Sequence, residues 1–333
     1  MDEPRPLYPE ITPHRSGRQR LSDLRDLHFQ KCGNPDGKRA VVLYAGPGGG
    51  ISPFLRQGHV IRRAIGSSCS INAVAGNRPR TRVLNRTPHR IWSPKSRRYE
   101  RTLASGHGRC LVAAGGATLA MAEASTRSDR VTELVLRGIF MTRKAEIDWF
   151  YQSGASQIFP DAFAKFAAPI PVAGRGDRLA AYHLRLAGPD GPENTEWARA
   201  WSRWEGTTIS SLPDPDRAAI FSADHFAAAF AGIKCHYFRN GGVFAHDGWI
   251  LREALAAISG VIIHGRQNVC TPWQNAWDLP QIWPEAELHV IADAGHTGTE
   301  PGIVDAKVGA LPPTRARPAS PPGYFQTEER LSL

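Results

Sequence analysis

The sequence lacks the features that mark membrane, secreted and metal-binding proteins. It has no run of about 18 or more apolar residues, and its N-terminal MDEPRPLYPE has neither the basic head nor the apolar core of a secretory signal. The five cysteines are odd in number, scattered and never arranged as C-x-x-C, which argues against a disulfide framework or a zinc knuckle. We therefore expect a cytoplasmic chain with free thiols, no metal site and no membrane partner.

The motifs of nucleotide-binding loops are also missing. A glycine cluster ends the segment KRAVVLYAGPGGG at 38–50, but the third glycine of G-x-G-x-x-G does not follow it. The segment GNPDGK at 33–38 is one residue short of a P-loop and lacks its Ser or Thr. The cluster is either a plain turn or a loop that presents backbone N–H groups to an oxyanion, because glycine lets a substrate approach closely.

The positive charge of the chain is confined to one stretch. Residues 51–110 contain twelve Arg, one Lys and one Glu, a net charge of +12, which leaves −2 for the rest of a chain whose net charge is +10. The stretch has no sustained period of 2 or 3.6, so we expect it to lack regular structure. Nucleic-acid binding through these arginines is an alternative that the sequence does not favour, because only Trp92 and Tyr99 are available nearby for base stacking.

The remaining segments predict an α/β protein. Apolar, β-branched stretches typical of buried strands, each followed by a loop, lie at 38–50, 131–138, 261–265 and 287–296. Strands separated by helical segments such as GATLAMAE at 116–123 predict a mostly parallel sheet covered on both faces. Trp- and Ala-rich segments between 147 and 256 predict a helical insertion. The Pro-rich, polar tail at 312–333 is expected to be disordered.

One histidine stands where an α/β-hydrolase holds its general base. His296 follows the last predicted strand in Asp-Ala-Gly-His, late in the chain and on a loop. Taken alone, a loop histidine is more often a bystander than a catalytic group. The nucleophile should sit earlier, in a G-x-S-x-G turn between a strand and a helix, and that motif is absent from the sequence.

Eight segments, taken together, resemble proline iminopeptidases. They are LYPEITPHRSG, FQKCGNPDGK, GPGGG, RVTELVLRGIF, DWFYQSGASQIFPDAF, WEGTT, HYFRNGG and AWDLPQIWPEAELHVIADAGH. The resemblance covers about 7–50 and 116–307, and implies an α/β-hydrolase fold with a helical cap inserted before the last two strands. It also implies a Ser-Asp-His triad that releases N-terminal proline from short peptides without any cofactor.

This resemblance divides the chain into parts. The N-terminal part of the hydrolase domain is 1–146, in which 51–110 is atypical and Arg-rich. The helical cap is 147–256, the C-terminal part of the hydrolase domain is 257–311, and the disordered tail is 312–333.

When the family's triad positions are matched residue by residue with this sequence, only one member of the triad is present. The general base falls on His296. The nucleophile of the family's G-G-S-W-G falls on Ala114, and the orienting aspartate of G-R-x-D falls on Asn268. The attacking hydroxyl and the carboxylate are therefore both missing.

Two further sites are altered as well. The oxyanion loop, H-G-G-P-G-G in the family, here has Ala45 and Gly46 at its second and third positions. In the cap, Glu205 matches a residue that contacts the substrate amine. The second such position, an acid in the family, is Lys234, which would repel an ammonium group.

These matches leave two main hypotheses. An active serine aminopeptidase is disfavoured, because an enzyme that has lost its triad keeps only about 10³-fold of catalysis over water. A non-catalytic or misfolded remnant of a frameshifted gene would explain the Arg-rich stretch 51–110. Loss of a central strand there would leave buried backbone groups unpaired, at about 1–3 kcal/mol each. The inactive interpretation fails if another side-chain oxygen or sulfur lies within hydrogen-bonding reach of the His296 imidazole at the mouth of the glycine loop.

Overall fold

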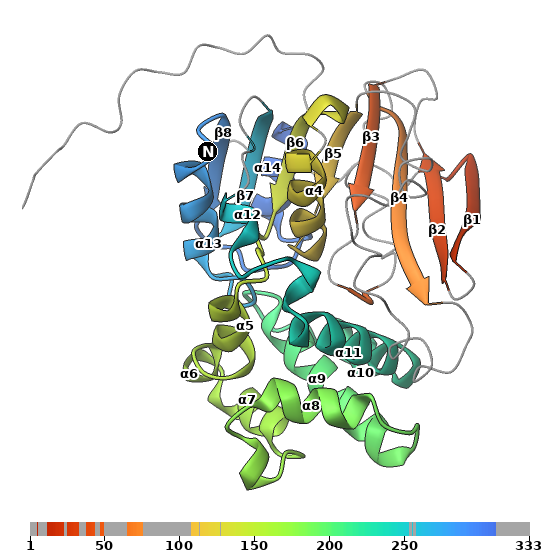
Figure 1. Cartoon of the computed structure of the whole chain (residues 1–333). Helices are drawn as coiled ribbons and strands as arrows, with labels where there is room; N and C mark the ends of the chain where they lie inside the picture. The colour runs from red at the N-terminus through yellow and green to blue at the C-terminus, as the bar shows by residue number, and fades with distance from the viewer. Residues whose placement is uncertain are drawn as a thin grey trace, which may run out of the picture.

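The computed structural model describes residue 5 and residues 12–22, 25–32, 38–43, 47–49, 65–75, 108–112, 114–126, 128–252, 255 and 258–310. Its centre is an eight-stranded sheet in the order β1-β2-β4-β3-β5-β6-β7-β8 (Figure 1). The strands are β1 Arg15–Ser22, β2 Arg25–Cys32, β3 Lys38–Leu43, β4 Ile65–Ala75, β5 Gly108–Val112, β6 Val131–Arg137, β7 Ser259–Gly265 and β8 Ala286–Ile291. Strands β3 to β8 pair in parallel, and β2 joins its neighbours β1 and β4 in antiparallel register.

The helices form two groups. Those beside the sheet are α4 Ala114–Thr126, α13 Trp273–Asp278 and α14 Pro301–Gly309. The second group, called the cap below, lies between β6 and β7 and contains α5 Lys144–Tyr151, α6 Ala155–Ile158, α7 Pro160–Ala167, α8 Arg178–Leu186, α9 Pro192–Thr208, α10 Pro215–Ser222 and α11 Asp224–Arg239. Helix α12 Trp249–Arg252 precedes β7 and packs with α4 beside the sheet. Short 3₁₀ turns lie at Ser128–Arg130, Val172–Gly174, Gly241–Val243 and Leu279–Gln281. None of the helices in the described ranges is both long and apolar enough to span a bilayer.

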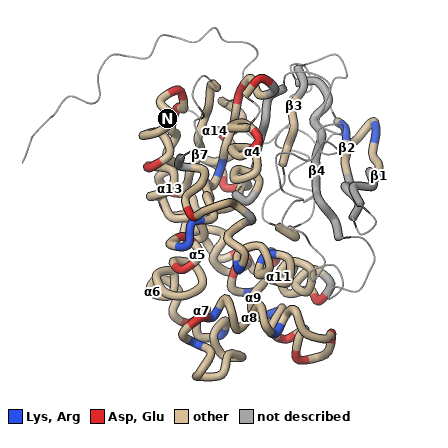
Figure 2. Tube along the Cα trace, viewed as in Figure 1, with Lys and Arg blue, Asp and Glu red and all other residues tan. Residues whose placement is uncertain are grey.

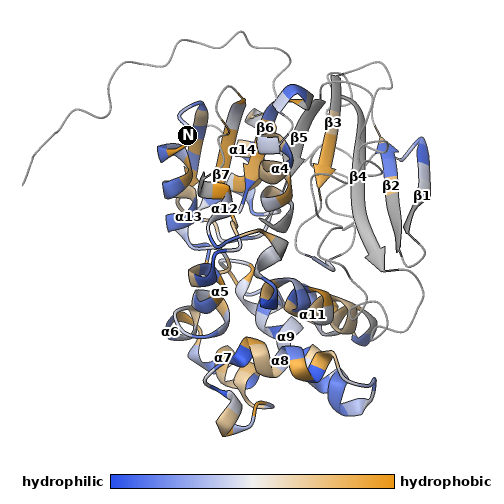
Figure 3. Cartoon of the chain, in the orientation of Figure 1, coloured by the Kyte–Doolittle hydropathy of each residue, from blue (hydrophilic) through white to orange (hydrophobic). Residues whose placement is uncertain are grey.

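Strand β6 illustrates how the sheet is covered on both faces. Side chains alternate along a strand, so neighbours point to opposite faces. Leu134 and Leu136 pack in a cluster with Met121 of α4, whereas Val135 packs in another with Ile303 of α14. Figure 3 shows the resulting hydrophobic stretches on β3, β6 and β7. The sheet is therefore the middle layer of an α/β-hydrolase fold.

The cap has an aromatic core of its own. Trp197, Trp201 and Trp204 recur at helical spacing on α9, and all three are buried against aromatic residues of neighbouring cap helices. Tyr151 stacks on Trp201 with 4.4 Å between ring centroids. On the outside of the cap, acidic and basic residues are interspersed (Figure 2). This core holds α9 and α11 as a rigid support for the polar side chains described below.

The expectation that 51–110 lacks regular structure is wrong for part of the stretch. Strand β4 lies within it and pairs with β2 and β3, and β5 pairs with β3 and β6. The sheet therefore has no missing central strand. The physical reason is that Ile65–Ala75 contains no charged residue, and ladder hydrogen bonds need only the backbone. The rest of 51–110 and the tail 312–333 lie outside the described residues.

Candidate active site

The loops that follow β7 and β8 bring the predicted base to the predicted acid position. Parallel strands end at the same edge of a sheet, where α/β proteins bind their ligands. Backbone bonds from Arg266 N to Ile291 O (2.8 Å) and from Gln267 N to Ala294 O (2.9 Å) tie the two loops together. The cap meets them at Ile209, whose carbonyl accepts a hydrogen bond from the His296 backbone N–H at 2.9 Å.

His296 and Asn268 are in direct contact. The His296 Nδ1 atom lies 3.2 Å from Asn268 Oδ1, and both residues are buried. The same amide oxygen accepts a bond from Thr271 N at 3.0 Å, while Asn268 Nδ2 donates to Thr271 Oγ1 at 2.7 Å. These two bonds fix which end of the amide faces the ring. Since an amide oxygen only accepts, the proton of the neutral imidazole is held on Nδ1 and Nε2 is left as the base.

The hydroxyl of Thr271 is a side-chain oxygen within hydrogen-bonding reach of the His296 imidazole. An oxygen in this position is the observation that would argue against an inactive site, so the side of the ring on which it lies matters. Its Oγ1 lies 3.3 Å from His296 Nδ1. This is the nitrogen that faces Asn268, whereas a nucleophile must face the opposite nitrogen, Nε2. Thr271 is also buried, and its hydroxyl already accepts the bond from Asn268. It therefore occupies the orienting side of the histidine.

A second buried histidine supports the same loop. His264 Nδ1 accepts a bond from Ile139 N at 3.2 Å, so the proton sits on Nε2, which lies 2.9 Å from the carbonyl oxygen of Thr271. Burial lowers the pKa of His264 to about 4. The ring is therefore neutral at pH 7 and holds the loop that carries Asn268.

The electrostatic surroundings of His296 oppose a charged imidazolium. Burial, together with the positive charges of Arg137 and Lys234, holds the pKa of His296 well below its usual value. The guanidinium of Arg137 donates to the His296 carbonyl oxygen, and burial lowers its own pKa to about 10, where it is still charged at pH 7. The contact geometry of a general base is present, but among the described residues no carboxylate contacts the imidazole to balance the charge that the base would acquire.

The predicted nucleophile position lies at the start of a helix. Ala114 is the first residue of α4, shortly after β5, which is where a hydrolase places its strand-to-helix turn. Gly116 allows this helix to approach β3, because a Cβ there would lie 2.3 Å from Leu43 O. The predicted oxyanion residues Ala45 and Gly46 lie outside the described residues.

In the cap, the two predicted amine-binding positions contact each other. Glu205 of α9, which is buried, and Lys234 of α11, which is partly buried, form an ion pair between Oε2 and Nζ. The other carboxylate oxygen, Oε1, accepts bonds from Tyr151 Oη at 2.8 Å and Trp201 Nε1 at 2.7 Å. Instead of only repelling an ammonium group, Lys234 supplies one to Glu205.

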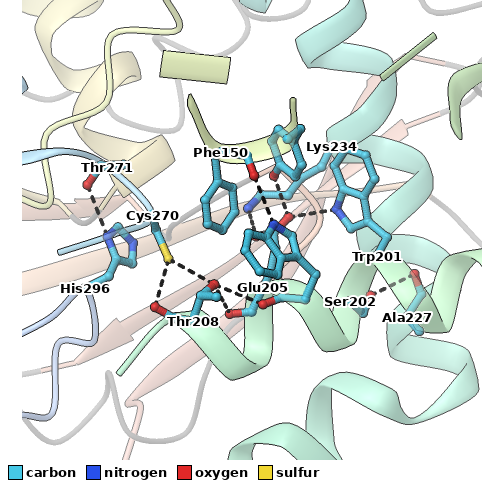
Figure 4. A network of polar contacts seen from close by, with 12 residues as sticks. Phe150, Trp201, Ser202, Glu205, Thr208, Ala227, Lys234, Cys270, Thr271 and His296 are labelled. Carbon is cyan, nitrogen blue, oxygen red and sulfur yellow. Dashed lines mark hydrogen bonds and ion pairs between the residues drawn. The ribbon is translucent and has the colours of Figure 1, made fainter. Parts of the chain in front are cut away.

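Cys270 lies between the histidine loop and the cap. Its sulfur points toward Thr208 (Figure 4), donating to the carbonyl oxygen at 3.5 Å. Burial, opposed only in part by nearby cations, raises the pKa of Cys270 to about 12. The thiolate form is therefore negligible at pH 7, and this cysteine is not an activated nucleophile.

In the described part of the chain, no group of three or more His, Cys, Asp or Glu is arranged to hold a metal ion.

Sequence reasoning missed several residues of the site. Arg137 and His264 are polar residues near the ends of apolar strands, and that interruption was an available signal. Thr271 carried no signal, because its role depends on the turn that returns it to Asn268. Tyr151 and Trp201 were hidden among the aromatic residues of the cap core.

Comparisons with known proteins identify the family of the chain. A family model described as the alpha/beta hydrolase fold matches residues 115–301, more than half of the chain. A proline iminopeptidase of Xylella fastidiosa is 42% identical over 310 residues, covering 92% of this chain and 98% of that protein. A proline iminopeptidase of Arabidopsis thaliana is 39% identical over 315 residues, covering 90% of this chain and 79% of that protein.

Solved structures show the same fold at low identity. A putative aryl esterase from Burkholderia cenocepacia aligns with a TM-score of 0.57 at 12% identity, covering 89% of this chain and 97% of that one. An esterase from Exiguobacterium antarcticum aligns with a TM-score of 0.54 at 10% identity, covering 89% and 98%. At such identities the likeness concerns the fold alone.

Proposed function

This chain belongs to the proline iminopeptidase family of α/β-hydrolases, and from that premise we propose that it is a scaffold of the family without acyl-transfer chemistry. The hydrolase domain in this proposal is 1–146 with 257–311, and the cap is 147–256. The observation that carries the proposal is the contact of His296 with an amide, Asn268, where the family has a carboxylate. Peptides with N-terminal proline are the ligand class carried over from the relatives' name.

The vacated chemistry follows from the triad mechanism. In an active serine hydrolase, a hydroxyl attacks the carbonyl carbon, histidine takes its proton at Nε2, and a carboxylate stabilises the imidazolium. Ala114 offers a methyl group in place of the hydroxyl. Asn268 supports the neutral tautomer of His296 but supplies no negative charge, and Arg137 opposes the positive one. His296 keeps its orientation, but there is no hydroxyl at position 114 to give it a proton and no carboxylate at position 268 to balance its charge.

The substitutions Ala114→Ser and Asn268→Asp, alone and combined, test the proposal. We expect the wild type to hydrolyse neither p-nitrophenyl acetate nor proline p-nitroanilide above the buffer rate. The double variant should hydrolyse the acetate ester, which carries no ammonium group, by at least about 10³-fold more than the wild type. Each single variant should remain far below the double variant, because triad residues act as a unit.

Two controls make the outcome decisive. Turnover by the wild type that is lost in His296→Ala or in Thr271→Val would overturn the proposal, because it would reveal a working nucleophile. Failure of a folded double variant, checked by circular dichroism, on the ester would overturn the idea that the scaffold is intact. Activity of the double variant that disappears on adding His296→Ala would support it.

A further inference from the structure

The loop that carries His296 is held by charged side chains at several successive residues. Below, the histidine loop means residues 295–300, which follow β8 and lead into α14. From the hydrolase domain, Arg137 donates to the carbonyl oxygen of His296, and Lys307 donates to that of Gly298 at 2.6 Å. Since these two cations belong to β6 and α14, they anchor the histidine loop to the hydrolase domain.

The cap anchors the same loop through Glu300. One carboxylate oxygen, Oε1, accepts bonds from the backbone N–H of Ser211 at 2.8 Å and from its hydroxyl at 2.6 Å. The other oxygen, Oε2, accepts a bond from Gly295 N at 2.9 Å. Ser211 belongs to the turn between α9 and α10, whereas Gly295 directly precedes His296. Glu300 therefore ties the cap to the backbone beside the base.

Arg217 of α10 makes a second tie, to the residues that follow His296. Its guanidinium donates from Nη1 to Thr297 Oγ1 at 2.7 Å and from Nη2 to Thr299 Oγ1 at 3.0 Å. The remaining nitrogen, Nε, donates to Asp214 Oδ2 at 2.9 Å. Because a guanidinium is planar and rigid, three partners fix its orientation. Arg217 therefore holds the part of the loop beyond His296 at a fixed place on the cap.

The cap turn 209–211 lies directly against the histidine loop. A Cβ at Gly295 would lie 2.8 Å from Ser211 N and 3.1 Å from the carbonyl carbon of Ser210. The backbone N–H of His296 donates to Ile209 O at 2.9 Å. Close-packed groups resist compression and transmit strain, so a displacement of this turn displaces the backbone of the histidine as well.

We propose that Glu300 and Arg217 are positioning residues that join the histidine loop to the cap, so that the imidazole of His296 keeps its alignment only while the cap is docked. That alignment is the contact of Nδ1 with Asn268. The hydrogen bonds of the two positioning residues go to neighbours of His296 in the loop. The inference goes beyond the proposed function, because it concerns the place of the base and not turnover. Its test uses no substrate, so it can fail while the proposed function stands.

The substitutions Glu300→Ala and Arg217→Ala each remove one tie, and NMR with ¹⁵N-labelled histidine reads the tautomer of His296. The wild type should show a single tautomer with the proton on Nδ1, because Asn268 Oδ1 can only accept it. In both variants the ring signals should move toward a mixture of the two tautomers. The amide N–H of His296, whose acceptor Ile209 O neither substitution touches, should exchange with solvent at least about tenfold faster.

The matched control is Asp177→Ala, which removes a carboxylate from another part of the cap. Asp177 accepts a bond from Ala180 N at 2.9 Å at the start of α8. Losing this helix cap should lower the Tm, whereas His296 should keep the tautomer and the amide exchange rate of the wild type. A change in Asp177→Ala equal to that in the two test variants would overturn the proposal.

An unchanged His296 in folded Glu300→Ala or in folded Arg217→Ala would also overturn the proposal. If one of these two variants does not fold, the other decides by the same criteria. If neither folds, the two ties serve the whole fold instead of the histidine, and the proposal fails.

Discussion

The two ends of the candidate site depart from a working enzyme in opposite ways. At the hydrolytic end groups are missing, since Ala114 lacks a hydroxyl and Asn268 lacks a charge, while His296 keeps its orientation. At the cap end a group has been added. The Glu205 carboxylate accepts bonds from Tyr151 and Trp201, and the Lys234 ammonium pairs with it.

The difference shows which kind of change a scaffold absorbs easily. An amide has nearly the shape of a carboxylate, so Asn268 fits the loop and contacts His296 while removing only the charge. A lysine brings new volume and charge, and it is tolerated because Glu205 already offered a counter-charge. We infer that the hydrolytic end needs replacement groups, whereas the cap end needs a group removed.

Repairing both ends in one chain gives the largest expected effect. Adding Lys234→Glu to Ala114→Ser and Asn268→Asp should raise kcat/KM for proline p-nitroanilide at least about 10³-fold over the wild type. The double variant still has Lys234 on Glu205, so its kcat/KM for the prolyl substrate should be about tenfold or more below that of the triple variant. Both should hydrolyse p-nitrophenyl acetate alike. Equal rates on the prolyl substrate would contradict the assignment of Lys234.

Breaking the cap pair should give the next largest effect. Glu205→Ala leaves the partly buried ammonium of Lys234 unpaired, and we expect the free energy of unfolding to fall by about 2–4 kcal/mol in urea titrations at neutral pH. The matched control is Arg199 with Asp224, which joins the same two helices at the surface. Arg199→Ala should cost far less, because water screens an ion pair at the surface. A similar loss for both variants would mean that burial of the Glu205 pair has no energetic consequence.

Restoring charge beside the base should raise the pKa of His296. In Asn268→Asp an anion faces Nδ1, and an opposite charge at this distance raises a histidine pKa by about 1–3 units. In the wild type the folded pKa lies below the unfolded value of about 6.5, so the unfolded state takes up the proton first and stability is lost as pH falls below that value. The variant should lose less stability between about pH 7.5 and about pH 5.5. Glu146 and Lys307, each with a pKa of about 7, also titrate in this window but are common to both proteins. His264 Nε2 lies 3.2 Å from Asn268 Nδ2, so the new carboxylate should raise the pKa of His264 as well. An unchanged histidine titration by NMR would contradict the prediction.

The support beneath the histidine gives a smaller effect. Gly138 has a φ of +59°, and a Cβ there would lie 2.9 Å from His296 Cε1. Gly138→Ala should therefore cost about 1–3 kcal/mol in the free energy of unfolding and displace the ring. Gly191→Ala is the control, since a Cβ there meets nothing within 4 Å and its φ of 177° is ordinary extended backbone. Equal losses in the two variants would show that the ring is not held by Gly138.

The sequence predicted the parts of the fold that depend on local pattern. The buried strands β3, β6, β7 and β8 were predicted from their apolar stretches. The contact between His296 and Asn268 follows because their loops lie at the ends of adjacent parallel strands. Strand β4 was missed because residues 51–110 were judged as one highly charged stretch, although the strand itself has no charged residue. An eleven-residue uncharged segment is long enough to form a strand whatever lies on either side.

The cap end could be predicted only in part. The substitution at Lys234 was visible, and the sequence correctly signalled a changed charge. That its ammonium lies on Glu205 depends on the packing of α9 against α11, which brings together residues 29 positions apart. Neither residue spacing nor composition records the angle between two helices. The sequence alone therefore could not distinguish a Lys234 that only repels a ligand's ammonium group from a Lys234 that pairs with Glu205.

Labelling with a fluorophosphonate tests the central claim most directly, because this reagent modifies a hydroxyl that a neighbouring histidine activates. The account predicts no His296-dependent labelling of the wild type and labelling of one hydroxyl, at position 114, in the Ala114→Ser, Asn268→Asp variant, located by peptide mass mapping. Labelling of the wild type at Thr271, Cys270 or any other residue in a His296-dependent manner would contradict it.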